Sequence, residues 1–378
     1  MEAFSSYSSK RDHPLTWRMK WHRYRNKLLS NPAFQRWAAR NPLTRSIGHR
    51  KALALHHLTA GFVYSQTLSA IVNLELLDRL ADGPVHTDEI AQGSALSIAA
   101  AETLLKAGGS LGLIEAYGNG LWGLGELGAA MRANPGIAEM VRHHEHLYQD
   151  LADPVRLLRH REGSALSRYW QYDTVLAGQG NPQVYSQLMR ESQAMIADHV
   201  LDAIDLSGCH LLVDIGGGTG AFAGRALDAF NTLKATVFDL PAVATAGAEL
   251  NVDNPRLRFA GGDMFTGPLP LGADVVSFNR VLHDHDDDKV RKVLRNAFSA
   301  LKPGGQIVIA EPMAETTGAE PIGHAYFGLY LWSLGSGRPR TLEELSRFLQ
   351  EAGFHELAEQ KTSMPCLVRV VTGIKPIS

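Results

Sequence analysis

Residues 211–227, LLVDIGGGTGAFAGRAL, form an apolar segment that breaks into glycines and then continues at helical spacing. A strand, a tight turn and a helix in this order are typical of open sheets that bind ligands beyond the carboxyl ends of their strands. Gly216, Gly218 and Gly220 can adopt a positive φ and let the backbone approach a ligand closely. The segment therefore predicts a turn that binds a nucleoside or nucleotide.

Two cofactors fit this turn. Read as GxGxxA over residues 216–221, it is a variant of the dinucleotide fingerprint. Read as DxGxGxG from Asp214 on, it is similar to the nucleoside-binding loop of S-adenosylmethionine enzymes. Asp239 ends the next predicted strand, where a carboxylate can accept hydrogen bonds from both ribose hydroxyls of either cofactor. The turn indicates the architecture and leaves the chemistry open.

Downstream of the turn, predicted strands alternate with helices. The strands are HLLVDI, KATVFDL, LRFAGGDMF, ADVVSFNRVL and GGQIVIAEP, and a helix is expected over residues 289–301. This alternation predicts an α/β fold with a mostly parallel sheet that is covered on both faces. The length of 378 residues favours two domains.

Upstream, residues 52–131 predict helices followed by a hairpin, the layout of a winged helix. One helix is expected to end at Gly83, a short capped helix follows it, another helix ends at Ala107, and two short strands lie around the Gly-Asn-Gly at 118–120. This layout raises the alternative of a DNA-binding regulator. The helix that would enter the major groove, 96–107, offers Lys106 as its only cation, whereas groove binding needs several polar side chains. The region is therefore expected to serve packing or dimerisation, with no nucleic-acid partner.

The first 51 residues form a basic segment. They hold 12 Lys and Arg against Glu2 and Asp12, a net charge of +10, while the remainder of the chain carries −12. Four aromatic residues lie among the cations: Trp17, Trp21, Tyr24 and Trp37. Such a segment can lie at an anionic membrane surface, or it can be a solvated arm that packs on a partner subunit.

Cysteine usage and hydropathy bear on localisation. Two cysteines, Cys209 and Cys366, give no disulfide framework and favour a reducing compartment. No apolar segment reaches the roughly 20 residues that a spanning helix needs. We therefore expect a cytoplasmic protein that could touch a membrane peripherally.

The order of the motifs resembles one family. VDIGGGTG, FDLP, GDMF, RVLHDH, LKPGGQIVIAEP and RTLEELSRFLQEAGF are similar to motifs of the S-adenosylmethionine (SAM)-dependent O-methyltransferases of the plant phenylpropanoid and hydroxyindole type. The resemblance implies a Rossmann-like SAM-binding sheet, an N-terminal winged-helix dimerisation domain, a homodimer, and S-adenosyl-L-homocysteine as product. The expected domains are a basic arm (1–51), a winged-helix domain with a helical connector (52–165) and a catalytic domain (166–378).

The resemblance also implies the site residues. His283 is expected to be the general base and Glu311 the acid that orients it. An adenine would lie between Met264 and Phe265, with Asp263 accepting from its amine. The cofactor-binding residues are expected to be Asp214, Gly216, Gly218, Gly220, Asp239, Leu240, Gly262, Asp263, Met264, Phe265, Asn279 and Ser192.

The chain departs from the family pattern at two positions. Pro339 replaces a second acidic residue near the base, and Asn279 replaces a lysine found in many plant relatives. The segment HDHDDD, 283–288, could also suggest a metal site. We expect none, because Asp286 looks like a helix N-cap followed by two acids in the first turn.

Several aromatic and methionine side chains could line an apolar substrate pocket or belong to the core. They are Met189, Met195, Tyr326, Phe327, Tyr330 and Trp332.

The expected activity is transfer of a methyl group from SAM to a hydroxyl of a hydrophobic small molecule. NPAFQRWAARNPLTRSIGHRKA, AGFVYSQ, SRYWQY and YSQLMRESQ are similar to the carotenoid branch of the family, which methylates a tertiary hydroxyl of an acyclic carotenoid. The alternatives are a methyltransferase of a tetrapyrrole or a small phenol, a winged-helix regulator that senses SAM, and an NAD-dependent oxidoreductase.

Overall fold

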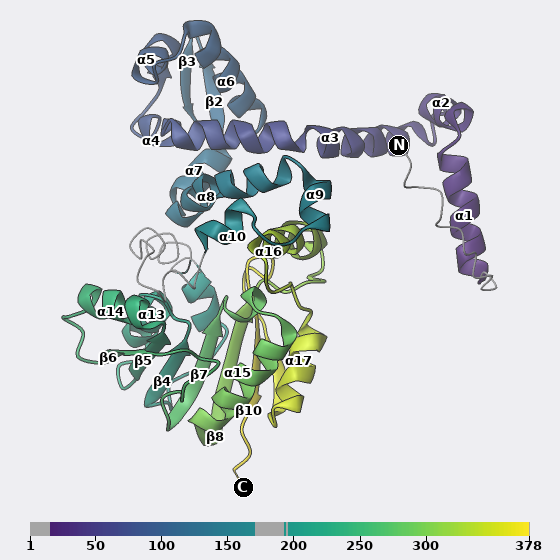
Figure 1. Ribbon diagram of the computed structural model, residues 1–378. Coiled ribbons are helices and arrows are strands. Elements are labelled where there is room, and N and C mark those ends of the chain that lie inside the picture. The colour runs from purple at the N-terminus through teal and green to yellow at the C-terminus, as the bar shows by residue number, and fades with distance from the viewer. Residues whose placement is uncertain (1–15, 171–192, 194–195, 378) are drawn as a thin grey trace. The chain divides into compact units, whose positions relative to one another are not determined.

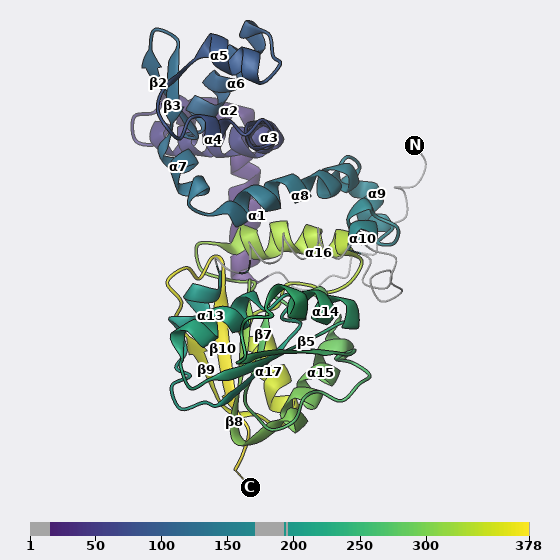
Figure 2. The ribbon, with the colours of Figure 1, turned by 90° about the vertical axis from the view of Figure 1, so that its left-hand side faces the viewer.

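The computed structural model describes residues 16–170, 193 and 196–377 (Figures 1 and 2). Two compact units divide the chain, Met1–Leu68 and Ser69–Ser378. None of the helices in the described ranges combines the length and the apolar composition needed to cross a membrane.

The first unit is helical throughout its described part. It contains α1 (Trp17–Leu29), α2 (Pro32–Arg40) and most of α3 (Arg45–Asn73). The side chains of Thr16 and Asn31 accept hydrogen bonds from backbone N–H groups in the first turns of α1 and α2. The helix α3 runs through residues 51 and 52 without a break, and the domain boundary expected there stays a prediction.

The expectation of one helix ending at Gly83 is wrong. The helix α3 ends at Asn73, and the short α4 (Leu76–Arg79) follows it. Between them Glu75 adopts a left-handed conformation with a φ of 54°, which interrupts the helical hydrogen-bond pattern.

The two predicted helices and the predicted hairpin follow, as α5 (Thr87–Gly93), α6 (Ile98–Ser110), β2 (Ile114–Gly118) and β3 (Leu121–Leu124). The structure adds the strand β1 (Val85–His86) and the helix α7 (Glu126–Arg132), which were not predicted. The strands form an antiparallel sheet in the order β1-β3-β2. The buried indole of Trp122 donates to the hydroxyl of Thr87 at 3.0 Å and links the hairpin to α5. In α6, Lys106 is paired with Glu102 at 2.7 Å, which weakens the case for a phosphate-binding helix.

The connector consists of α8 (Pro135–Leu151), α9 (Pro154–Arg159) and α10 (Ala165–Tyr169). They pack against α16 (Gly328–Leu334), which belongs to the sequence after the sheet's fifth strand. The shared apolar cluster comprises Leu147, Leu166, Trp170, Tyr330, Leu331 and Leu334.

The C-terminal part contains a mostly parallel sheet, as predicted from the alternation of strands and helices. Its first five strands are β4 (Leu211–Ile215), β5 (Lys234–Asp239), β6 (Leu257–Gly261), β7 (Ala273–Asn279) and β8 (Leu301–Glu311). Two strands that were not predicted, β9 (His355–Gln360) and β10 (Arg369–Ile374), extend it to seven. The order is β6-β5-β4-β7-β8-β10-β9, with β10 antiparallel to both neighbours. The strand order reverses between β4 and β7, so a ligand is expected at the carboxyl ends of these strands.

Helices cover both faces of this sheet (Figure 1). On one face α15 (Asp287–Ala300) and α17 (Leu342–Glu351) contribute Val293 and Phe348 to the core. On the other face α13 (Ala221–Ala229) contributes Phe222. The helix α14 (Pro241–Leu250) packs along β5 and β6. Successive residues of a strand point to opposite faces, and this alternation assigns the polar side chains of β4 and β7 to the face of α13.

Candidate functional site

The glycine turn follows β4 in the predicted conformation. Gly216, Gly218 and Gly220 have φ values of 68°, 59° and 87°, a region that side chains rarely adopt. At Gly216 an added Cβ would lie 2.8 Å from Cγ2 of Val281, so the turn also contacts the loop after β7. The turn therefore depends on glycine for its conformation and, at Gly216, for space.

Asp214 lies fully buried beneath the turn. Its Oδ1 accepts from the hydroxyl of Ser277 at 2.6 Å and from Nδ2 of Asn279 at 3.0 Å. Burial raises the pKa of Asp214 to about 7, against the opposing effect of these two hydrogen bonds. Within the described residues, Asp214 Oδ2 and Asn279 Oδ1 are buried acceptors without a hydrogen-bond partner. Such atoms are costly in a folded core and typical of a site completed by a ligand or water.

A pocket opens beside this pair. Its described lining consists of Gln193, Ile196, Ala197, Phe222, Asn279 and Arg280. Arg280, the residue after β7, has a φ of 56°, a strained conformation that is frequent at binding sites. The sequence did not single out Arg280, and its place directly after the strand that ends in Asn279 was the available signal.

The ends of β5 and β6 meet the glycine turn. Asp239 accepts from the backbone N–H of Gly218 at 2.8 Å through Oδ2 and from that of Leu240 at 2.7 Å through Oδ1. The backbone N–H of Gly262 donates to the carbonyl of Asp239 at 2.9 Å. Burial raises the pKa of Asp239, although both backbone hydrogen bonds favour its ionised form. Four residues predicted to bind the cofactor thus lie together.

The GDMF motif forms a turn after β6. The two oxygens of Asp263 accept from the N–H of Phe265 at 2.8 Å and from the hydroxyl of Thr266 at 2.7 Å. Met264 and Phe265 are half-buried and pack on the core, and the Phe265 ring contacts His285 edge-on, with centroids 4.8 Å apart. The proposed position of an adenine between Met264 and Phe265 stays a prediction.

His283 lies in a short helical turn, η1 (Leu282–Asp284), after β7. Its Nδ1 contacts Oε2 of Glu311 at the end of β8, and the other oxygen of Glu311 accepts from the N–H groups of Val281 and Leu282 at 3.0 and 2.7 Å. Both His283 and Glu311 are buried. The carboxylate therefore fixes the imidazole and the turn that carries it.

Asp284 contacts the other side of the same imidazole. Its Oδ1 lies 3.2 Å from Nε2 of His283. Burial disfavours the charged form of His283, but the charges of Glu311 and Asp284 outweigh it, and the pKa of His283 is raised above its usual value. The sequence left the role of Asp284 open, because only the fold shows on which side of the ring it lies.

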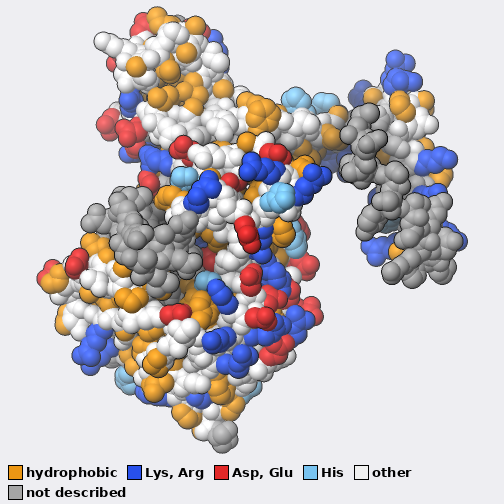
Figure 3. Space-filling view, viewed as in Figure 1, with side chains coloured by type: hydrophobic (Ala, Val, Ile, Leu, Met, Phe, Trp, Pro, Cys, Tyr) orange, Lys and Arg blue, Asp and Glu red, His pale blue; other side chains and the backbone are white. Residues whose placement is uncertain are grey.

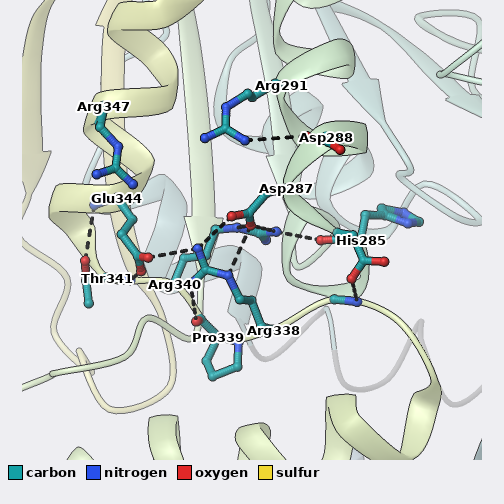
Figure 4. A network of polar contacts seen from close by, with 12 residues as sticks. His285, Asp287, Asp288, Arg291, Arg338, Pro339, Arg340, Thr341, Glu344 and Arg347 are labelled. Atoms are coloured by element: carbon teal, nitrogen blue, oxygen red, sulfur yellow. Dashed lines mark hydrogen bonds and ion pairs between the residues drawn. The ribbon is translucent and has the colours of Figure 1, made fainter. Parts of the chain in front are cut away.

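The segment after α16 holds η1 in place. The backbone N–H of Arg338 donates to the carbonyl of His283 at 2.9 Å. The buried guanidinium of Arg340 donates to the carbonyls of Leu282 and His285 at 2.7 and 2.6 Å and to Asp287 at 2.8 Å. Figure 4 shows this network, which we name the arginine clamp (Arg338 and Arg340 on Asp287). The sequence motifs did not indicate this network.

Pro339 lies between the two arginines of the clamp (Figure 4). Its carbonyl accepts from Arg338 at 3.5 Å, and its side chain offers no acceptor to His283. The backbone of this segment bonds the carbonyl of His283, and the Asp284 carboxylate contacts its ring.

The acids of HDHDDD have partners other than a metal. Asp286 occupies the N-cap position of α15, but its Oδ1 accepts from the N–H of Gly337 at 3.0 Å and not from the helix. Asp287 belongs to the arginine clamp, and Asp288 is exposed and 3.7 Å from Arg291. Burial lowers the pKa of His285 to about 4.

Of the aromatic residues that could line a substrate pocket, some pack in the core and one contacts His283. The hydroxyl of Tyr330 lies 2.9 Å from both His143 and Trp170, and the indole of Trp332 donates to the carbonyl of Leu157. The ring of Phe327 contacts His283, with centroids 5.9 Å apart.

Tyr326 precedes Phe327 and bonds His144 through its hydroxyl at 2.7 Å. Three other predicted residues, Ser192, Met189 and Met195, lie outside the described residues.

These residues fit an adenosine-bearing cofactor with a charged amino-acid tail. Asp239, at the strand end next to the glycine turn, can accept from two vicinal hydroxyls. Asn279 lines the pocket and has a buried, unsatisfied acceptor oxygen, which suits a hydrogen bond from an ammonium group. The imidazole of His283, held by Glu311, is suited to removing a proton nearby.

Comparisons with known proteins give the family. Residues 148–355 match the model of the O-methyltransferase domain, and residues 56–132 match that of the O-methyltransferase dimerisation domain. The chain is 36% identical to demethylspheroidene O-methyltransferase of Cereibacter sphaeroides, over 93% of this chain and 94% of that protein. It is 30% identical to acetylserotonin O-methyltransferase of Mus musculus, over 82% and 86%.

Among solved structures, human N-acetylserotonin methyltransferase in complex with SAM is similar, with a TM-score of 0.72. The two chains are 26% identical, and the match covers 86% of this chain and 98% of the human one. Both the sequence and the fold thus lead to one conclusion: the chain belongs to the O-methyltransferases that have an N-terminal dimerisation domain, and it is an enzyme whose cofactor is SAM.

Proposed function

We propose that the enzyme methylates the tertiary hydroxyl of an acyclic hydroxycarotenoid, with His283 as the general base. The buried contact of His283 with Glu311 and Asp284 carries the proposal for the base. Two relatives named demethylspheroidene O-methyltransferase, 36% and 37% identical to this chain, support the acceptor class.

SAM, when bound, would supply the methyl group and leave as the thioether. The acceptor oxygen forms the new carbon–oxygen bond and releases its proton to Nε2 of His283. Nδ1–H of His283 donates a hydrogen bond to the carboxylate of Glu311, which leaves the lone pair on Nε2. Asp284 then stabilises the imidazolium that forms.

A tertiary alcohol is a much weaker acid than a phenol, so its proton must leave while the carbon–oxygen bond forms. A base of raised proton affinity suits this requirement, because it binds the proton more tightly in the transition state. The two carboxylates around His283 provide it. In the reaction the sulfonium loses its positive charge and the acceptor oxygen loses its developing negative charge. A pocket without water favours this loss of charge more than bulk water does.

The remaining site residues are assigned by position. Asp214, the glycines of the turn, Asp239, Leu240, Gly262 and the GDMF turn would hold the cofactor, together with Asn279 and Ser192. The enzyme would act as a homodimer through the region of residues 56–132, and an apolar polyene acceptor would bring it into peripheral contact with a membrane.

Incubation with methyl-labelled SAM and a panel of acceptors tests the proposal. The panel holds a hydroxycarotenoid, its dehydrated counterpart without the hydroxyl, a tetrapyrrole and a small phenol. We expect label in an ether of the hydroxycarotenoid alone. Label in the tetrapyrrole or the phenol, with an unlabelled carotenoid, would reject the acceptor and leave the family assignment intact.

A further inference from the structure

The helices α1 and α2 carry an apolar surface that the described residues of their own unit leave exposed. Neither helix has a buried residue. The exposed fractions are 80% for Trp17, 56% for Trp21 and 54% for Trp37, and Leu43 in the following turn is 86% exposed. Single exposed apolar residues are ordinary at a protein surface, but a cluster of this kind in one segment marks an interaction site.

The apolar residues of α1 lie on one face. Trp17, Trp21, Tyr24 and Leu28 follow one another at intervals of four, three and four residues, the spacing of a single helical stripe. The rings of Trp21 and Tyr24 are in contact, with centroids 6.0 Å apart. In α2, the rings of the Phe34–Trp37 pair lie 5.7 Å apart. We name Trp17, Trp21, Tyr24 and Leu28 of α1, together with Phe34 and Trp37 of α2, the aromatic stripe.

Cations flank the aromatic stripe on both sides. The same helical spacing places Lys20 and Lys27 on one flank of the stripe and Arg18 and Arg25 on the other. Residues 16–51 contain ten Lys and Arg and no Asp or Glu. Figure 3 shows Lys and Arg side chains on this part of the chain. Apolar rings between two rows of cations form the pattern of a helix that lies in the plane of a membrane interface.

We propose that α1 and α2 dock the enzyme on an anionic lipid bilayer. The rings of the aromatic stripe would enter the headgroup region, and the flanking cations would be attracted by the negative surface potential. The exposed aliphatic residues Leu29 and Leu43 favour lipid over nucleic acid, because an aliphatic side chain does not stack on a base. The proposal does not depend on the identity of the methyl acceptor.

Sedimentation of the full chain with lipid vesicles tests this proposal. The vesicles are phosphatidylcholine alone or with about 30% phosphatidylglycerol. We expect binding to the anionic vesicles and its loss at about 0.5 M salt, where charges are screened within a few ångströms. The triple variant R23Q/R25Q/K27Q should lower the partition coefficient about 100-fold, and W17S/W21S at least tenfold.

Matched controls replace exposed residues elsewhere. R347Q removes a cation and Y117S an exposed ring without changing the arm, and both should bind vesicles like the parent. Calorimetry with SAM and light scattering are run on every variant, so that a loss of folding or of assembly is seen directly.

Three results would overturn the proposal. One is equal binding of all variants to anionic vesicles. Another is an absence of vesicle binding while the arm variants dissociate the dimer, which would assign the arm to a second copy of the chain. The third is retention on RNA without vesicle binding. None of these results bears on methyl transfer to a soluble acceptor.

Discussion

At the scale of the residue, the proton affinity of His283 is set by two carboxylates on opposite sides of one buried ring. Glu311 contacts Nδ1 and Asp284 lies 3.2 Å from Nε2. Burial works against the imidazolium, and the carboxylates more than compensate, so the pKa of His283 is raised. A base must be neutral to accept a proton. The activity is therefore expected to fall as the pH drops below this raised pKa.

Glu311→Gln tests this balance. Removal of the negative charge lowers the pKa of His283, so the acid limb of the kcat/KM profile should move to lower pH. The plateau should fall at least tenfold, because glutamine can also donate to Nδ1 and select the wrong tautomer.

The control for this variant is Glu359→Gln, which removes an exposed carboxylate paired with Arg369 and should leave the profile unchanged. An acid limb that stays in place in Glu311→Gln would show that Glu311 does not set the proton affinity of the base.

Site residues could be predicted from the sequence where a polar side chain lies at the end of an apolar strand. Asp214 lies one residue before the end of β4 and Asp239 ends the neighbouring β5, and the apolar residues that precede each of them predict these strand ends. Arg340 was not assigned, because its role depends on the packing of segments more than 50 residues apart. The role of Asp284 was left open, because the sequence does not show that its carboxylate lies against Nε2 of the neighbouring His283.

At the scale of the element, two features support the site. The glycine turn after β4 shapes the predicted cofactor site, and the arginine clamp fixes η1, the turn after β7 that carries His283. Each can be altered without touching the reacting groups.

Gly216→Ala should destabilise the protein by about 1–3 kcal/mol and weaken SAM binding. The φ of 68° is strained for alanine, and its Cβ would lie 2.8 Å from Val281. Thermal unfolding and calorimetry with SAM measure both effects. The matched control is Gly224→Ala in α13, where nothing lies within 4 Å and helix propensity favours alanine by about 1 kcal/mol. Equal melting temperatures of the two variants would contradict this account.

Arg340→Met should lower kcat about tenfold and cost about 2 kcal/mol of stability, because it leaves the carbonyls of Leu282 and His285 without their buried donor. The affinity for SAM should change little. Arg347→Met is the control, since Arg347 lies on α17 and is exposed. A kcat equal to that of the parent would mean that the clamp does not position His283.

Elements were predictable where a period is uniform. The alternation of strands and helices predicted the parallel part of the sheet. The position of β10 between β8 and β9 did not follow from it, because the pairing of an antiparallel strand depends on contacts distant in the sequence. The break at Glu75 was missed, since its apolar neighbours keep the helical spacing on both sides.

At the scale of the whole molecule, the match of residues 56–132 to a dimerisation domain predicts a homodimer. The mass in solution should be about twice 41.2 kDa by light scattering. Leu58 and Phe62 on α3 are 83% and 71% exposed, one helical turn apart. L58E/F62E should therefore yield monomers, whereas L250E on α14 should not. A monomeric parent, or a dimeric L58E/F62E, would contradict this prediction.

The central claim is that His283 removes the proton of the acceptor hydroxyl while the cofactor binds elsewhere. Its most direct test compares His283→Ala with the parent in two measurements, the turnover number at saturating SAM and the dissociation constant of SAM. We predict a turnover at least 100-fold lower and a dissociation constant within threefold of the parent. Turnover close to that of the parent would contradict the claim.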